Sequence, residues 1–241
     1  MSQHFFPFAL LPVVFFVGMI ALGITLAVVG ARRRRRRTEA LQAYAHARGF
    51  AFHLDGSGLE DRFTGDPFGR GRRRRAQQVL EGTVQGRPFI AFDYSYVTSN
   101  GKNSTTHHFS VVSVHLGAFV PLLQVRPQNA FGRFFSDAFG TDFRIGYPPF
   151  DDAFHVSTNS PEFTADVMTQ QVCDTLLATR QRAWRFDGDS LLLFRAGQHE
   201  GGEIDAVLSQ AVHVLGLVPE RVWARARGEA GPTDGVTDAP V

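Results

Sequence analysis

The sequence predicts an α+β protein in which an N-terminal transmembrane helix is followed by a domain with an antiparallel β-sheet covered by helices. An apolar run from Phe5 to Ala31 contains no Asp, Glu, Lys or Arg. Strand-like segments then follow in series between residues 77 and 125, and helix-like apolar periodicity dominates after residue 160. Strands grouped before helices, rather than alternating with them, are typical of the α+β class.

The apolar run is long enough to span a bilayer, because a hydrocarbon core of about 30 Å needs about 20 helical residues. A cleaved signal peptide begins with positive charge and ends at a small-residue cleavage site. Here no Lys or Arg precedes the run, and cleavage near Gly30 or Ala31 would meet a block of arginines. We therefore expect residues 1–31 to form an N-terminal segment and a retained transmembrane helix.

Six consecutive arginines follow the run and form a juxtamembrane stop at residues 32–37. Arginines close to a span are retained on the cytoplasmic side. The expected topology is therefore a single-pass protein of the plasma membrane, with its N-terminus outside and the chain from Thr38 in the cytoplasm. Each charge also attracts anionic lipid headgroups by about 1 kcal/mol. The residues expected to orient the span and bind headgroups are Arg32, Arg33, Arg34, Arg35, Arg36 and Arg37.

The charge of the remaining chain argues against a general nucleic-acid-binding domain. Six of the 25 Lys and Arg residues lie in the arginine run, which leaves 19 against 23 acidic residues, a net charge of −4. A nucleic-acid-binding fold needs a basic face of its own. The single cysteine, Cys173, excludes an internal disulfide and lies in an apolar helical pattern, so a buried thiol is expected.

Residues 38–227 are expected to form one cytoplasmic domain, and residues 228–241 a disordered tail. Thr38 is placed to cap a helix that stops at Gly49. A short strand follows, and then a Gly-rich surface loop from Leu54 to Arg75, whose arginines (Arg70 and Arg72 to Arg75) are expected to be solvated and passive.

The sheet is expected to be a meander with hairpin turns. Strands at 77–84 and 88–97 are joined by Gln-Gly-Arg, and an Asn-Gly pair leads into 105–116. Residues 118–125 are expected to form a fourth strand, and a later hairpin is expected to turn at Asp187 to Asp189. Phe131 to Phe139 fit a helical aromatic face, and a strand starts at Phe154. Helices are expected at 161–179 and 203–219.

No arrangement of catalytic residues is evident in the sequence. Adjacent His107 and His108 would point to opposite faces of a strand, and Asp151 and Asp152 would likewise point apart. His199 to Glu203 (His-Glu-Gly-Gly-Glu) has an unspecific spacing for a metal, and no other cofactor is indicated. The domain is therefore expected to be a binding or scaffolding module.

The alternative is a membrane-tethered enzyme, either a hydrolase or a metal-dependent one, whose site is assembled only in the fold. Its sign would be a deep polar pocket in which His53, His115 or His155 meets acidic residues, whereas a shallow aromatic surface would favour the module.

Several segments resemble a group of uncharacterised actinobacterial single-pass membrane proteins with a cytoplasmic α+β domain of unknown function. They are the span with its arginine stop, "ALQAYAHARGFAF", "FIAFDYSY", "FSVVSVHL", "FDDAFHVST" and "VLGLVPERVW". The resemblance covers Phe5 to Trp223. It implies a membrane-tethered α+β domain and provides no catalytic residues to carry over.

The expected partners follow from this organisation. They are the lipid bilayer through one helix, anionic headgroups, and a protein partner of unknown identity. Gly23, Ala27 and Ala31 recur every four residues and would let two spans pack closely, so a homo-oligomer through the span is a further expectation.

Overall fold

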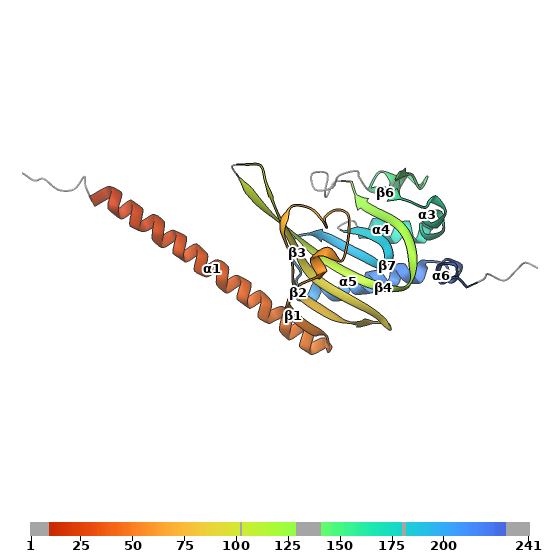
Figure 1. The fold of residues 1–241 in the computed structure, drawn as a ribbon, viewed down its shortest axis with the longest axis horizontal. Helices are drawn as coiled ribbons and strands as arrows, with labels where there is room; N and C mark the ends of the chain where they lie inside the picture. The colour runs from red at the N-terminus through yellow and green to blue at the C-terminus, as the bar shows by residue number, and fades with distance from the viewer. Residues whose placement is uncertain (1–9, 102, 129–140, 180–181, 230–241) are drawn as a thin grey trace, which may run out of the picture. The chain divides into compact units, whose positions relative to one another are not determined.

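The computed structural model describes residues 10–101, 103–128, 141–179 and 182–229. The chain divides into two compact units, the first ending at Ala43 and the second beginning at Tyr44. The predicted α+β class is confirmed: a long apolar helix comes first, and an antiparallel sheet with covering helices follows (Figure 1). The aromatic segment predicted at 131–139, and the tail from residue 230 onward, lie outside the described residues.

Helix α1 runs without a break from Leu10 to Arg48. Within the described residues it contains the one stretch that is long and apolar enough to cross a membrane, with a window of mean hydropathy 2.5 that is 0% buried. The prediction that a new helix starts at Thr38 is wrong. The Thr38 hydroxyl donates to the Arg34 carbonyl inside the helix, because a run of arginines has high helix propensity and offers no stop signal.

The predicted stop at Gly49 is confirmed. Gly49 takes a φ of 69°, and its N–H donates to the carbonyl of His46. The next N–H, that of Phe50, donates to Ala45. A left-handed glycine that satisfies the last helical carbonyls is a common helix end.

All strand pairs in the described sheet are antiparallel, in the order β1-β2-β3-β4-β6-β5, with β7 also paired to β4. The strands are β1 (Ala51–Asp55), β2 (Arg72–Val84), β3 (Arg87–Ser99), β4 (Ser104–Pro127), β5 (Thr141–Phe143), β6 (Phe154–Thr158) and β7 (Ala183–Ala196). The predicted β2–β3 turn is confirmed, since Gln85 and Gly86 both have positive φ, as a tight two-residue hairpin requires. β4 is the central strand.

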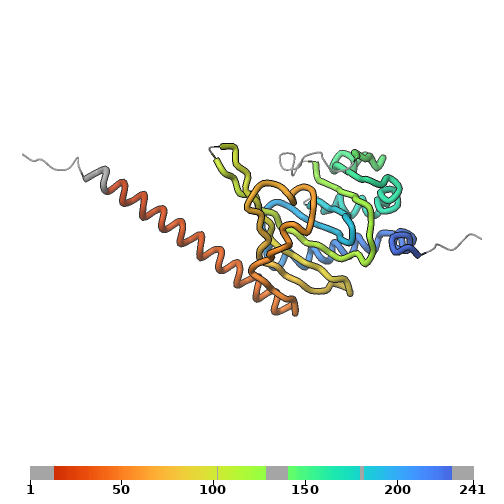
Figure 2. Tube along the Cα trace, viewed as in Figure 1, coloured from red at the N-terminus to blue at the C-terminus, as the bar shows by residue number. Residues whose placement is uncertain are grey.

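Three predictions about strands are wrong. Arg72 to Arg75 belong to β2 rather than to a surface loop. Residues 118–125 continue β4 instead of forming a fourth strand, and Figures 1 and 2 show β4 as one long curved segment. β7 passes through Asp187 to Asp189 without a hairpin. Gly117 and Gly188 take positive φ at the bend, so these glycines accommodate a bulge and not a reversal.

The helices of the second unit are α2 (Pro148–Asp151), α3 (Pro161–Val167), α4 (Gln170–Ala178), α5 (Gly201–Leu217) and α6 (Glu220–Ala226), with a 3₁₀ turn η1 (Leu59–Asp61). The predicted helix at 161–179 is in fact two helices, because Thr169 leaves the helical conformation and its hydroxyl caps α4 at Val172. The predicted last helix is followed by α6. Helices α5 and α6 contact β4, and α5 also contacts β7.

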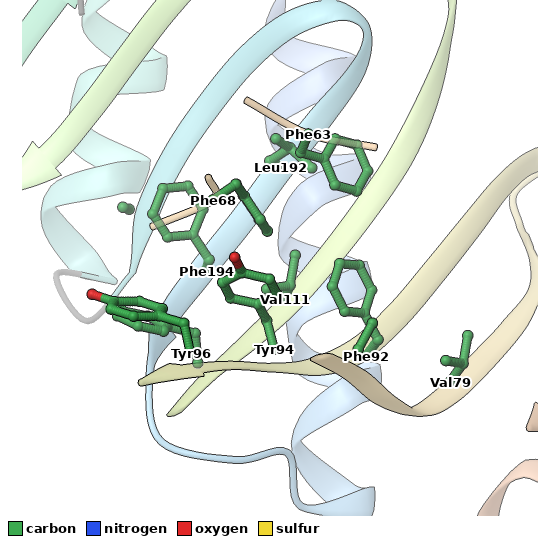
Figure 3. Close-up of a cluster of buried hydrophobic side chains, with 12 residues drawn as sticks. Phe63, Phe68, Val79, Phe92, Tyr94, Tyr96, Val111, Leu192 and Phe194 are labelled. Carbon is green, nitrogen blue, oxygen red and sulfur yellow. The ribbon is translucent and has the colours of Figure 1, made fainter. Parts of the chain in front are cut away.

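The two faces of the sheet have different covers. One face, which we call the helix face, packs against α5 and α6. The other, the loop face, is covered by residues 56–71, whose Phe63 and Phe68 lie in one buried cluster with Phe92 and Tyr94 (Figure 3). The segment predicted to be a solvated loop is therefore partly a core element, because its aromatic side chains fill the space above the strands.

Candidate functional site

A groove of about 630 Å³ opens on the loop face beside the buried aromatic cluster. Its floor comes from strands that the sheet register brings together: Glu81 of β2 pairs with Ile90 of β3, which pairs with Ser113 of β4. His115 lies two residues further along β4 and pairs with Ser190 of β7. Because side chains alternate along a strand, Ser113 and His115 continue the row that starts with buried Phe109 and Val111.

A histidine–aspartate pair forms the polar centre of the groove. His115 Nδ1 lies 3.5 Å from Asp189 Oδ2, and the two side chains are 44% and 38% exposed. The Ser190 hydroxyl donates to the other carboxylate oxygen of Asp189, at 2.7 Å. The pair is therefore half open to solvent, and Asp189 is held by its neighbour in a fixed orientation.

The pair exists because β4 bulges at this point. Between the pairs His115–Ser190 and Val120–Gly188, β4 contains the four residues 116–119, whereas β7 contains Asp189 alone. Arg87 braces the bulge by donating to the Leu116 carbonyl at 2.7 Å. Bulges often re-aim side chains next to functional sites, and this one places Asp189 beside the imidazole of His115.

The arrangement is similar to the base-orienting half of a catalytic triad, in which a carboxylate holds a histidine, but the 3.5 Å between the two atoms is longer than the hydrogen bond of such a pair. The nucleophile half differs from that pattern. The Ser190 hydroxyl is bonded to the carboxylate rather than to the imidazole. In the part of the chain that the structure describes, no hydroxyl is hydrogen-bonded to His115.

The other histidines named from the sequence do not join this groove. His155 Nε2 lies 2.8 Å from Asp142 Oδ1, on the neighbouring strands β6 and β5. His53 is exposed on β1. The structure therefore brings two of the three predicted histidines to carboxylates, at two separate places.

The predicted metal candidate at 199–203 has structural partners instead. The backbone N–H of His199 donates to Asp93, and its ring Nε2 lies 2.9 Å from the Val111 carbonyl. Glu203 accepts from Arg182 and Arg195. Burial lowers the pKa of His199, which keeps the ring neutral near pH 7. Across the described ranges, no three His, Cys, Asp or Glu side chains are grouped for a metal ion.

Two further candidates are also structural. Asp151 accepts from the backbone N–H groups of Ile145 and Gly146, and so closes the turn before α2. Cys173 is fully buried, as predicted, and burial raises the pKa of its thiol to about 12. A thiol with such a pKa is not a nucleophile at neutral pH.

The two arginine runs differ in their surroundings. Arg32 to Arg37 lie within α1, where the Arg35 side chain pairs with exposed Glu39 at 2.8 Å. In the second run, Arg70 pairs with Asp66 and Arg74 with Asp61. Both partners come from the segment that covers the loop face. Arg74, on β2, therefore helps to hold that cover to the sheet, and Arg70 forms an ion pair within the cover; the sequence suggested neither role.

The sequence did not indicate four residues of this site: Asp189, Ser190, Ser113 and Glu81. The available signal was weak: polar residues interrupt the apolar alternation of β4 at Ser113 and His115, on the face that Phe109 and Val111 bury. Nothing in the sequence near Asp189 indicates which histidine it meets.

No family model matches the chain, and no curated protein matches it. Among solved structures, the fold is similar to the crystal structure of the mycobacterial trehalose monomycolate transport factor A, TtfA, with a TM-score of 0.57 and 11% sequence identity. The match covers 77% of this chain and 97% of that one. At this sequence identity the likeness establishes a shared fold. The mycobacterial source of the solved structure is consistent with the resemblance of the sequence to actinobacterial proteins.

Proposed function

We propose that the protein is a membrane-anchored cytoplasmic binding module that recruits a partner at the inner face of the plasma membrane and does not itself catalyse a reaction. The observation that carries this proposal is the charge-free apolar part of α1, which passes directly into six arginines and then into a folded domain. A single span raises the local concentration of an attached domain at the membrane surface, which favours binding of partners located there.

The proposed organisation has four parts: residues 1–31 for the N-terminal segment and span, 32–37 for the basic stop, 38–227 for the cytoplasmic domain and 228–241 for the tail. Orientation follows from the arginines, which favour the cytoplasmic side and anionic headgroups. A fluorescent protein fused after Val241 should therefore be bright, and alkaline phosphatase fused there should be inactive. Active phosphatase with a dark fluorescent fusion would reverse the orientation.

The likeness to TtfA supports one form of this role. TtfA is a transport factor, and we propose that this chain likewise takes part in transport, as a module that binds a partner at the membrane. The shared fold is compatible with a module that acts by binding.

Proximity labelling from the full chain in its native membrane tests the proposal. Two variants provide matched controls: one keeps residues 38–241 behind an unrelated transmembrane helix, and the other keeps residues 1–37 without the domain. We expect the first variant to label the same neighbours as the full chain and the second to lose them. Identical labelling by the second variant would show that the span, and not the domain, selects the neighbours.

A hydrolase is the second candidate function, and the observation that favours it is the His115–Asp189 pair in an open groove. Turnover of short-chain ester or amide substrates by the purified full chain, abolished by His115→Ala but not by His155→Ala, would establish this function in place of the first.

A further inference from the structure

We propose that the groove on the loop face is a binding site for an uncharged ligand rich in hydroxyl groups, of the size and chemistry of a disaccharide. This assignment rests on the proposed binding function and deepens it by naming a site and a ligand class. It does not depend on how the domain is anchored.

The polar lining of the groove is suited to hydroxyl groups. The carboxylate of Asp189 and that of Glu81 accept hydrogen bonds, Ser113 and Thr83 can both donate and accept, and Ser190, whose proton goes to Asp189, can accept. The imidazole of His115 adds a further ring nitrogen. A ligand hydroxyl is also a donor and an acceptor, so it can pair with every one of these groups. Hydrogen bonds to charged carboxylates are stronger than bonds between neutral groups.

The charges of the groove disfavour an anionic ligand. Two carboxylates, Glu81 and Asp189, face the cavity together with one arginine, Arg62. Arg62 is exposed and lies over the ring of Phe63 at 5.4 Å, at the edge of the loop cover. A phosphate would meet two like charges. A cation would meet Arg62, and it would leave the three hydroxyl side chains without a matching partner. An uncharged polar ligand avoids both costs.

Apolar surface lies beside these polar groups. Ile90 and Pro88, which alternate on the same side of β3, line the same cavity. Phe119 projects from the bulge in β4 and is 77% exposed, although it is a large apolar side chain. Its ring would lie 3.8 Å from a Cβ built on Gly188, the residue before Asp189. The C–H faces of sugar rings pack well on aromatic and aliphatic surface, whereas a fully solvated ion does not.

The size of the groove agrees with this class of ligand. Small-molecule sites typically have volumes of about 300–1,000 Å³, and the 630 Å³ of this groove lies in the middle of that range. The volume is sufficient for a disaccharide, and the bulge with its Arg87 brace preforms the wall that carries Asp189 and His115.

The test uses the full chain in phospholipid nanodiscs without sugar headgroups, with binding followed by saturation-transfer NMR and titration calorimetry. The probes are maltose and sucrose, with glucose 6-phosphate as the anionic control and glucosamine as the cationic one. We expect a neutral disaccharide to bind at least about tenfold more tightly than the charged sugars. Asp189→Asn and His115→Ala should each weaken its binding by at least about tenfold.

The chain offers a matched control in its second histidine–aspartate pair. Asp142→Asn and His155→Ala remove a closer pair, at 2.8 Å, that lies outside the groove. We expect these two variants to bind the disaccharide like the parent protein. Three outcomes would each overturn the assignment. They are equal losses of binding in Asp142→Asn and Asp189→Asn, no binding of either disaccharide, and tighter binding of a charged sugar than of a disaccharide.

A neutral sugar reaches this site either as a free molecule or as a lipid headgroup, and one more comparison separates the two. If dodecyl maltoside binds more tightly than maltose, and dodecylphosphocholine does not compete with it, the ligand is a lipid headgroup. If the two bind equally, the ligand is a free sugar. If sugar binding fails while the domain still selects its neighbours in proximity labelling, the ligand assignment falls and the proposed recruiting function stands.

Discussion

The two faces of the sheet are held to their covers in different ways. On the loop face, Arg185 is fully buried, and its guanidinium donates to the backbone carbonyls of Thr64 and Asp66 and to the side chain of Gln124. On the helix face, Arg182 and Arg195 instead meet a carboxylate, that of Glu203 at the start of α5.

The difference follows from the hydrogen-bonding needs of each cover. The backbone groups of a helix bond to one another, so α5 presents apolar side chains and needs few polar contacts with the sheet. Residues 56–71 have little regular structure, so their buried carbonyls must find donors elsewhere. A guanidinium with five N–H groups satisfies several carbonyls at once. Arg185 therefore acts as a fixed donor beneath an irregular cover.

The largest effect is expected from Arg185→Met, which leaves the carbonyls of Thr64 and Asp66 without their donor. Unpaired buried acceptors cost about 1–3 kcal/mol each, so we expect a loss of about 3–5 kcal/mol in the free energy of unfolding. Urea unfolding of the full chain in micelles measures it through tryptophan fluorescence, because both tryptophans, Trp184 and Trp223, lie in the second unit. Arg225→Met, at an exposed ion pair, is the control. A small loss for Arg185→Met would mean that the cover does not depend on this donor.

A smaller effect is expected from Glu203→Gln on the helix face. The substitution leaves Arg182, which is almost fully buried, without its carboxylate partner. Removing one partner of a buried ion pair costs about 3–5 kcal/mol; since Glu203 is partly exposed, we expect about 2 kcal/mol by the same unfolding measurement. Glu220→Gln, at an exposed pair with Arg227, should change stability little. A loss larger than that of Arg185→Met would contradict the contrast between the two faces.

The third prediction concerns pH, through His199 on the helix face. Burial lowers the pKa of its ring, while Asp93 and the Val111 carbonyl oppose the shift and Arg182 adds to it. A base with a lowered pKa in the folded state binds its proton more readily when unfolded. Stability should therefore be full above the ordinary histidine pKa of about 6.5 and should fall as the pH drops below it. Melting temperatures at pH 7.5 and 5.5 test this.

The control for that pH effect is His199→Gln, which keeps a donor for the Val111 carbonyl and removes the titration. We expect its melting temperature to fall less than that of the parent protein between the two pH values. The same fall in both proteins would assign the pH dependence to other groups.

The smallest effects are expected at the two histidine–aspartate pairs, which lie outside the contrast between the covers. Both pairs are partly exposed, and exposed ion pairs contribute about 0–1 kcal/mol. Asp189→Asn and Asp142→Asn should each change the free energy of unfolding by less than about 0.5 kcal/mol. A larger loss for Asp189→Asn would mean that this residue stabilises the bulge in β4, and ligand binding would then have to be measured with His115→Ala.

Much of the fold could be predicted because its signals are local. The apolar run, the stop at Gly49, the β2–β3 turn at Gln85 and Gly86, and the strand at Phe154 each depend on a few adjacent residues. The errors arose where a local signal has two outcomes. In the sequence, Gly117 and Gly188 indicated breaks between strands. A glycine with positive φ also permits a bulge, and the pairing of β4 with β7 decides which of the two structures forms.

The candidate site was predicted only in part. His115 was named as one of three histidines that would mark a deep polar pocket if they met acidic residues; it does meet one, but in an open groove where both side chains are partly exposed. The identity of that residue, and the contributions of Glu81 from β2 and Ser190 from β7, depend on the register of four strands. A shift of one residue in any pairing would turn these side chains to the other face.

The sequence by itself determined the helix that is long and apolar enough to cross a membrane, the basic block that follows it and the class of the domain, because hydropathy, charge and periodicity are properties of contiguous residues. Tertiary structure alone decided that residues 56–71 cover a sheet face and that His115 meets Asp189 in an open groove. It also decided that Arg185 bonds to carbonyls 119 and 121 residues away. The physical reason is that an irregular segment has few internal hydrogen bonds to define it, so its conformation depends on donors and apolar surface supplied by distant strands.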